Sequence, residues 1–230
     1  MEWYEPDVRD LEVAAHRQQL PACPAVLYGS SSMRLWTTFS RDLRSVNIVN
    51  RAFGGSTLAA CVHYFDRLIP GVHPCSLILY AGDNDLGDGR SPADVLASFD
   101  AFLNKMEAFK LGKIPFAFIS IKPSPARASI LDNIRNVNHA VQRQLEQRPN
   151  SYFINTFDAM LDREGRVRPE LFLEDGLHMS RAGYAIWIDH INPYRNQLFM
   201  ETQQVSYDGP LLLKESEQGL RQVVQPRPEP

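Results

Sequence analysis

Five short apolar segments, spread along the chain, constrain the fold more than any other feature. They are rich in β-branched and aromatic residues, and consecutive positions are apolar instead of alternating with polar ones. A strand of this kind is buried on both faces, which is typical of a parallel sheet covered by helices on each side. The five segments span residues 25–29, 46–53, 76–82, 114–121 and 151–157.

The stretches between these segments show the periodicity of helices. The clearest helix is predicted over about 92–110, where Ser91 is a suitable N-cap and apolar residues recur three or four apart. Further helices are predicted over about 129–147 and 181–199. Strands that alternate with helices form right-handed βαβ units. We therefore predict a three-layer, doubly wound α/β fold with five parallel strands in the flavodoxin-like order 2-1-3-4-5.

The 230 residues suit one sizeable α/β domain. We predict a helical lead-in over 1–23, the α/β domain over 24–200, and an extension over 201–230 whose proline-rich end has the composition of a disordered segment. The extension contains three consecutive leucines at 211–213. Docking of these leucines on a second copy would make a homo-oligomer, which is one hypothesis for the extension.

Charge and hydropathy exclude several classes of protein. The net charge of -3 gives no basic excess that would attract nucleic acid. No apolar stretch reaches the length of a membrane span, and the charged N-terminal stretch lacks the apolar run of a secretory signal. We therefore expect a cytoplasmic protein, with export as the open alternative, and neither a membrane span nor a nucleic-acid partner.

The cysteines and most of the histidines suggest no special chemistry. Cys23, Cys61 and Cys75 are odd in number and widely spaced, so we expect neither a disulfide framework nor a zinc cluster and interpret them as small buried residues. Five histidines lack the spacing of metal ligands, namely His16, His63, His73, His139 and His190. No metal and no cofactor are expected.

Two polar loops follow strands that are neighbours in the predicted sheet. Residues 29–32 read GSSS after the first strand, and residues 81–85 read AGDND after the third. In the order 2-1-3-4-5 the loops after these strands diverge at the carboxyl edge and open a crevice in which ligands bind. We therefore predict the functional site at this edge.

A serine in this crevice can act as a nucleophile if a base removes its proton and a third group orients that base. Asp175 and His178 lie three residues apart, after the fifth strand. On a tight turn, this spacing lets the carboxylate hold one ring nitrogen while the other faces outward. The spacing alone is more typical of a surface turn, but opposite a serine loop it indicates nucleophilic catalysis.

Four stretches, in this order, resemble the sequence blocks of the SGNH/GDSL hydrolase family. They are VLYGSSSMRLW at 26–36, VNRAFGGST at 49–57, LYAGDNDLGDG at 79–89 and EDGLHMSRAGY at 174–184. The resemblance covers about residues 24–195. It implies the doubly wound hydrolase fold and a serine esterase that needs no metal or cofactor.

The resemblance also assigns roles to single residues. It implies that Ser31 is the nucleophile and that His178 and Asp175 complete a catalytic triad. The N–H groups of Gly55 and Ser31 and the amide of Asn84 would form the oxyanion hole. The family's common Gly-Asp-Ser-Leu reads Gly-Ser-Ser-Ser at 29–32. Three adjacent hydroxyls leave the register open, so Ser30 is the alternative nucleophile.

The substrate is the least specified part of the prediction. The favoured hypothesis is an esterase for small-molecule esters with short acyl groups, such as acetyl esters of carbohydrates, because the connecting loops are short and carry no apolar lid. A lysophospholipase or thioesterase is the runner-up, and a non-catalytic ligand-binding module is the hypothesis from a different class. Candidate substrate-binding residues are Ser30, Trp36, Lys122 and Pro123, with Arg127 in the same loop.

Overall fold

The computed structural model describes residues 1–17 and 19–199 of the chain, and they contain a five-stranded sheet. Neighbouring strands pair in parallel in the order β2-β1-β3-β4-β5, so the predicted fold class and strand order are confirmed. The central strands are buried along their whole length, as their apolar sequence indicates. The strands are β1 (Ala25–Gly29), β2 (Ile48–Asn50), β3 (Ser76–Tyr80), β4 (Phe116–Ile119) and β5 (Ser151–Ile154).

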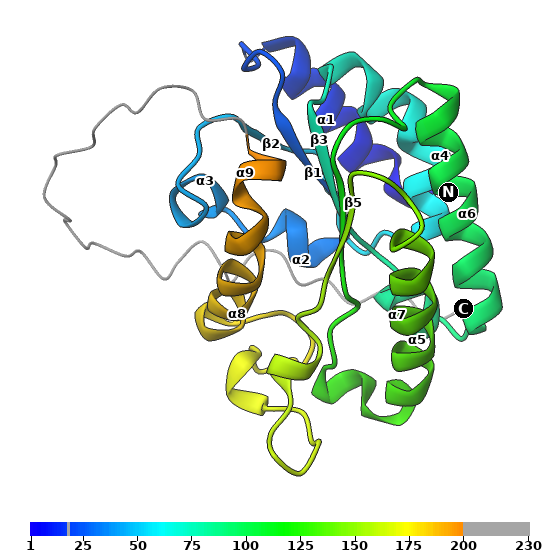
Figure 1. Cartoon of the computed structure of the whole chain (residues 1–230), viewed down its shortest axis with the longest axis vertical. Coiled ribbons are helices and arrows are strands. Elements are labelled where there is room, and N and C mark those ends of the chain that lie inside the picture. Colours follow the sequence, from blue (N-terminus) through cyan, green and yellow to red (C-terminus); the bar gives the residue numbers. More distant parts are fainter. Residues whose placement is uncertain (18, 200–230) are drawn as a thin grey trace, which may run out of the picture.

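Helices cover both faces of the sheet (Figure 1). Successive residues of β1, such as Leu27 and Tyr28, point to opposite faces of the sheet and belong to two separate hydrophobic cores. The core around Tyr28 is closed by α1 (Glu5–Arg17), α4 (Leu58–Leu68), α6 (Pro92–Ala108) and α7 (Leu131–Leu145). The core around Leu27 is closed by α2 (Ser31–Arg34), α3 (Phe39–Asp42), α8 (Arg181–Ile191) and α9 (Arg195–Leu198).

Shorter elements connect these layers. Helix α5 (Asp83–Gly87) directly follows β3 and places its first residues at the carboxyl edge of the sheet. The remaining elements are 3-10 turns: η1 (Glu2–Tyr4), η2 (Pro70–Val72), η3 (Pro125–Ile130), η4 (Asp158–Met160), η5 (Pro169–Leu171) and η6 (Asn192–Tyr194).

The predicted helices are present, with one correction. Helix α6 begins with a capping box, in which Ser91 and Asp94 each accept the other's backbone N–H. The helix predicted over 181–199 is divided, because α8 ends at Ile191 and Pro193 follows in η6. Proline has no N–H and its ring clashes with the preceding turn, which ends a regular helix.

The N-terminal residues form a helix that packs on the domain. Val8 of α1 is fully buried in the core, and Arg67 of α4 binds Glu5 and Glu12 of α1 at 2.9 and 2.7 Å. The domain boundaries stay predictions. The extension over 201–230, with the homo-oligomer hypothesis that it carries, lies outside the described residues.

The interpretation of two cysteines was wrong, because Cys23 and Cys75 form a disulfide. They immediately precede β1 and β3, which lie side by side with Ala25 paired to Ser76. Their Cα atoms are therefore 4.9 Å apart, although 52 residues separate them in sequence. Cys61, in contrast, is buried and free, as expected.

Within residues 1–17 and 19–199, no helix combines the length and the apolar character needed to cross a membrane.

Candidate active site

Ser31 lies where β1 passes into α2. Gly29 ends the strand with φ +127, and a Cβ at this position would lie 1.9 Å from the Tyr80 carbonyl oxygen, so only glycine fits. The next residue, Ser30, donates its N–H to the same Tyr80 oxygen and serves as the N-cap of α2. Ser31 is therefore the first residue of the helix, at the carboxyl edge of the sheet.

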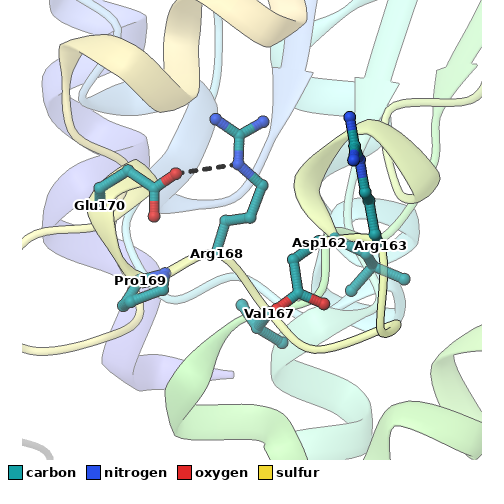
Figure 2. A pocket seen from close by; sticks show the side chains of 7 residues that line it. Asp162, Arg163, Val167, Arg168, Pro169 and Glu170 are labelled. Atoms are coloured by element: carbon teal, nitrogen blue, oxygen red, sulfur yellow. Dashed lines mark hydrogen bonds and ion pairs between the residues drawn. The ribbon is translucent and has the colours of Figure 1, made fainter.

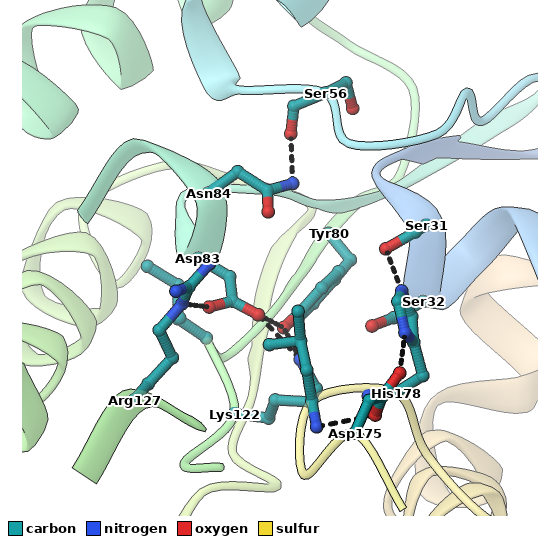
Figure 3. Close-up of polar contacts among 12 residues, drawn as sticks. Ser31, Ser32, Ser56, Tyr80, Asp83, Asn84, Lys122, Arg127, Asp175 and His178 are labelled. Carbon is teal, nitrogen blue, oxygen red and sulfur yellow. Dashed lines mark hydrogen bonds and ion pairs between the residues drawn. The ribbon is translucent and has the colours of Figure 1, made fainter. Parts of the chain in front are cut away.

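Asp175 and His178 come from the loop between β5 and α8. One oxygen of Asp175 accepts the N–H groups of Leu177 and His178 at 2.8 and 2.9 Å, which closes a tight turn. The other oxygen lies 2.6 Å from His178 Nδ1, and His178 Nε2 lies 3.0 Å from Ser31 Oγ. Figure 3 shows this continuous line of contacts. The structure thus brings together three side chains that the sequence analysis had selected.

The ionisation of Asp175 determines which nitrogen of His178 carries the proton in this row of contacts. Partial burial raises the pKa of Asp175, but hydrogen bonds from the His178 ring and from two backbone N–H groups outweigh it, so the pKa lies below its ordinary value. An ionised carboxylate only accepts hydrogen bonds, so His178 Nδ1 carries the proton that it donates. Nε2 is then the acceptor facing the Ser31 hydroxyl, which is the arrangement of a general base and its nucleophile.

The two predicted oxyanion-hole residues lie on the neighbouring loops. Gly55 follows β2 and has φ +64, and Asn84 lies in the first turn of α5 and is buried. The Asn84 amide donates to the Ser56 carbonyl at 3.0 Å, which ties the two loops together (Figure 3). That amide has a second hydrogen available for another acceptor. Donation to a substrate oxygen by these residues stays a prediction.

A buried charged cluster lies beside Asn84. Lys122 Nζ donates to Asp83 at 2.6 Å and to the Tyr80 hydroxyl at 3.2 Å, and Arg127 Nε donates to the other Asp83 oxygen at 3.2 Å. Burial opposes both charges, but their mutual attraction outweighs it, so the pKa of Lys122 is raised and that of Asp83 is lowered. Burial raises the pKa of Tyr80 to about 12. Lys122 and Asp83 are therefore both ionised at neutral pH.

The candidate substrate-binding residues are all buried. Ser30 is 2% exposed, Trp36 and Lys122 are 1% exposed, and Pro123 is also buried. Trp36 donates to Asp42 at 2.9 Å and stacks on Tyr184, whereas Lys122 binds Asp83. Because each of these side chains offers little surface to a ligand, their contact with substrate stays a prediction that would require local movement.

Two residues that hold α2 had no assigned role in the sequence analysis. The Tyr184 hydroxyl donates to the Ser32 carbonyl at 2.8 Å, and the Asn50 amide donates to the Met33 carbonyl at 2.8 Å. Both bonds fix the short helix that presents Ser31. Their position inside the recognised sequence blocks was the available signal, but their partners depend on the tertiary structure.

A surface pocket of about 370 Å³ lies elsewhere, in the loop between β5 and the turn that carries Asp175 and His178 (Figure 2). Arg168 and Glu170 form an ion pair at 2.9 Å on its wall. None of the predicted site residues lines it. The lining residues are Leu161, Asp162, Arg163, Val167, Arg168, Pro169 and Glu170.

Comparison with protein families gives a match over residues 25–186. The matching model is that of the GDSL-like lipase/acylhydrolase family, and it confirms the resemblance identified from the four blocks. No curated protein matches the sequence.

Several solved structures share the fold. A GDSL-like lipase from Bacteroides thetaiotaomicron is 18% identical, with a TM-score of 0.69 over 82% of this chain and 97% of that chain. A lipase/acylhydrolase from Enterococcus faecalis is 16% identical, with a TM-score of 0.62 over 79% and 100%. A carbohydrate esterase family 3 protein from Talaromyces cellulolyticus is 17% identical, with a TM-score of 0.62 over 77% and 98%. At these identities the likeness shows the fold alone.

Proposed function

The chain belongs to the GDSL-like lipase/acylhydrolase family, and from that premise we propose that it is a serine esterase that hydrolyses carboxylic esters. The observation that carries the proposal is the pair of contacts made by His178, 2.6 Å to Asp175 and 3.0 Å to Ser31. This arrangement supplies a nucleophile, a base and an orienting carboxylate in the geometry that acyl transfer requires.

In the first step, Ser31 Oγ attacks the ester carbonyl carbon while His178 Nε2 takes the hydroxyl proton. The carbonyl electron pair moves to oxygen, and the N–H groups of Ser31 and Gly55 and the Asn84 amide stabilise the resulting anion. When the tetrahedral intermediate collapses, the C–O bond to the alcohol breaks and His178 returns its proton to the leaving oxygen. The ionised Asp175 stabilises the transient imidazolium.

In the second step, water replaces the alcohol. His178 removes a proton from water, the hydroxide attacks the acyl carbon, and the proton passes to Ser31 as the acid departs. The same donors stabilise the second oxyanion. No further group is needed to balance the reaction.

For the substrate we infer short acyl esters, such as acetyl esters of carbohydrates. The shared fold of the carbohydrate esterase from Talaromyces cellulolyticus is consistent with this class. The loops that carry Ser31 and Asn84 turn directly into helices after their strands, which leaves them no room for an apolar lid. Lysophospholipase or thioesterase activity at the same site is the alternative.

Substitution of Ser31 tests the mechanism. The Ser31→Ala variant is expected to lose almost all hydrolysis of p-nitrophenyl acetate, because it lacks the nucleophile, while its circular dichroism and melting temperature stay near wild type. Ser32→Ala is the matched control. Among the described residues, the serine hydroxyl that bonds to His178 is that of Ser31, so this variant should keep activity within about tenfold.

Labelling separates an esterase from a binding module of the same fold. A serine-reactive fluorophosphonate should form one adduct, at Ser31, in the wild type and none in Ser31→Ala. Full activity in Ser31→Ala, or no adduct in the wild type, would reject the proposal. A series of esters from acetate to dodecanoate in the same assay then tests the acyl length, and a maximum at long chains would favour the lipid-directed alternative.

The disulfide bears on where this chemistry takes place. Cys23 and Cys75 are joined, and disulfides form and persist mainly in oxidising compartments. We therefore infer folding in an oxidising compartment, in place of the cytoplasm expected from the sequence.

A further inference from the structure

Two hydrogen bonds from the N-terminal residues hold the loop that carries Gly55. The Gly54 N–H donates to Asp7 of α1 at 3.0 Å, and the Tyr4 hydroxyl of η1 donates to the Gly55 carbonyl at 3.2 Å. Both partners come from a segment that precedes the family-matched residues 25–186. This segment is therefore attached directly to the proposed oxyanion hole.

The positions of the two bonds matter for the Gly55 N–H. That N–H belongs to the peptide group between Gly54 and Gly55, and its direction depends on the backbone angles of both glycines. Glycine has the largest conformational freedom of any residue, and Gly55 adopts φ +64. The bond to Asp7 holds the peptide group that precedes the Gly54–Gly55 peptide, because it engages the Gly54 N–H. The bond from Tyr4 holds the peptide group that follows it, because it engages the Gly55 carbonyl. The N–H is thus fixed from both sides.

The N-terminal segment is itself firmly attached, so it can act as a support. Val8 is fully buried, and the Tyr4 ring packs edge-on against Phe53 and Tyr64 at 5.5 and 6.4 Å. The Tyr64 hydroxyl donates to the Met1 carbonyl at 2.8 Å. Packing of this kind restrains a helix more than exposed ion pairs do.

Asp7 also connects this loop with the nucleophile helix. The oxygen that accepts the Gly54 N–H lies 3.7 Å from Arg34 Nε, and Arg34 is the last residue of α2. A Cβ built on Gly54 would lie 3.2 Å from the Arg34 side chain and 3.3 Å from Asp7, so the three residues are closely packed. Asp7 therefore contacts both segments that would contribute backbone donors to the oxyanion hole.

We propose that Tyr4 and Asp7 are positioning residues that aim the Gly55 N–H at the developing oxyanion. The inference rests on the proposed function, because it requires Gly55 to donate to the reacting carbonyl oxygen. Neither side chain touches the substrate. Their effect is to reduce the freedom of a two-glycine loop before the reaction, which is how a preorganised donor lowers an activation barrier.

The test compares variants that remove each bond. Tyr4→Phe keeps the ring packing and loses the hydroxyl, and Asp7→Ala loses the acceptor of the Gly54 N–H. Each should lower kcat about tenfold with KM nearly unchanged, which is less than the hundred- to thousandfold loss typical of removing an oxyanion donor outright. Affinity for a trifluoromethyl ketone, which forms a tetrahedral oxyanion on serine, should fall in parallel. Asp7→Asn retains an acceptor oxygen and should restore most of kcat.

The control is Glu12→Gln, which weakens the contact of α1 with Arg67 and leaves in place the two bonds that Asp7 and Tyr4 make to the glycine loop. It should leave kcat unchanged. The inference is overturned if Tyr4→Phe and Asp7→Ala keep kcat within twofold, or if Glu12→Gln lowers kcat equally. If Ser31→Ala is fully active, the proposed function itself fails and this inference fails with it. If Ser31→Ala is inactive and the N-terminal variants are normal, this inference alone fails.

Discussion

Three adjacent serines occupy different environments although they share one chemistry. Successive side chains on a helix point about 100° apart, so Ser30, Ser31 and Ser32 cannot all face the same loop. Ser30 and Ser32 are buried, and Ser31 is the one whose hydroxyl contacts His178. The geometry therefore favours Ser31 over Ser30 as the nucleophile in the proposed mechanism.

Asp175 is the residue at which a change of one atom is most informative. Asp175→Asn places an amide N–H against His178 Nδ1, which favours the tautomer with the proton on Nε2. That ring nitrogen can then no longer accept the Ser31 proton, so kcat should fall about ten-thousandfold. Steady-state kinetics at pH 7 would measure the loss, and a decrease of less than tenfold would contradict the orienting role.

The lowered pKa of Asp175 predicts how the stability difference between the wild type and the same variant depends on pH. A carboxylate with a lowered folded-state pKa stabilises the protein above its unfolded pKa, and this contribution is lost as the pH falls through the folded value. The melting temperature of the wild type should therefore exceed that of Asp175→Asn at pH 7. The difference should shrink below about pH 4.

At the scale of secondary-structure elements, the first turn of α5 connects more segments than its length suggests. Asp83 binds Lys122 and Arg127, Asn84 donates to Ser56, and Asp85 accepts the Leu58 N–H at the start of α4 at 2.7 Å. Three consecutive side chains therefore bind two separate segments, the one that follows β4 and the one that leads from β2 into α4. This turn fixes where the Asn84 amide lies relative to Ser31.

Lys122→Met should weaken this arrangement by leaving Asp83 with only Arg127 as a charged partner. Removing one member of a buried ion pair typically costs about 3–5 kcal/mol, and Arg127 should keep the loss near the lower end. Urea denaturation at pH 7 would measure it. The loss should decrease below about pH 4, because Asp83, whose pKa is lowered by Lys122, then becomes neutral in the variant.

The double variant Lys122→Met, Asp83→Leu is the control for this effect. It removes both charges together, so most of the lost stability should return. An equal loss of stability in the single and double variants would show that the loss comes mainly from the packing of the lysine side chain and not from its charge.

At the scale of the whole molecule, the disulfide and the proposed active site lie at opposite edges of the sheet. The disulfide joins the residues that precede β1 and β3, whereas Ser31 and Asn84 follow the same two strands. The two central strands are thus tied at the amino edge while their carboxyl ends carry the site. The disulfide can therefore stabilise the domain without contacting the reacting groups.

The Cys23→Ser, Cys75→Ser double variant should lose about 2–4 kcal/mol of unfolding free energy, because the disulfide restricts a long loop of the unfolded chain. Its kcat should match that of the wild type. Treatment with dithiothreitol should lower the melting temperature of the wild type and leave that of the variant unchanged. A wild type that is insensitive to reduction would contradict a stabilising disulfide.

Thiol titration of the unreduced, unfolded protein adds a direct count. It should detect one thiol, that of Cys61, since the other two cysteines are joined. Three thiols in protein isolated from its native compartment would reject the inferred oxidising environment.

The sequence by itself determined the architecture and the candidate triad. Uninterrupted apolar runs specify strands buried on both faces, and helical segments between them indicate parallel pairing. The order with β1 beside β3 is that of the flavodoxin-like fold, one of the two common orders for such a sheet, and the structure has it. The same order places the loops at 29–32 and 81–85 together, and the turn at Asp175 depends on residues only three apart. These features are local, and local features can be predicted from neighbours in sequence.

Only the tertiary structure decided which distant groups meet. Ser31 and His178 are 147 residues apart, Gly54 and Asp7 are 47 apart, and Lys122 and Asp83 are 39 apart. The break of the last helix at Pro193 and the burial of Lys122 differ in kind. The proline is a local signal that ends the helix, but the burial depends on Asp83 lying opposite. Such contacts arise from the packing of whole elements, and no local sequence pattern encodes the distance between two side chains brought together in that way.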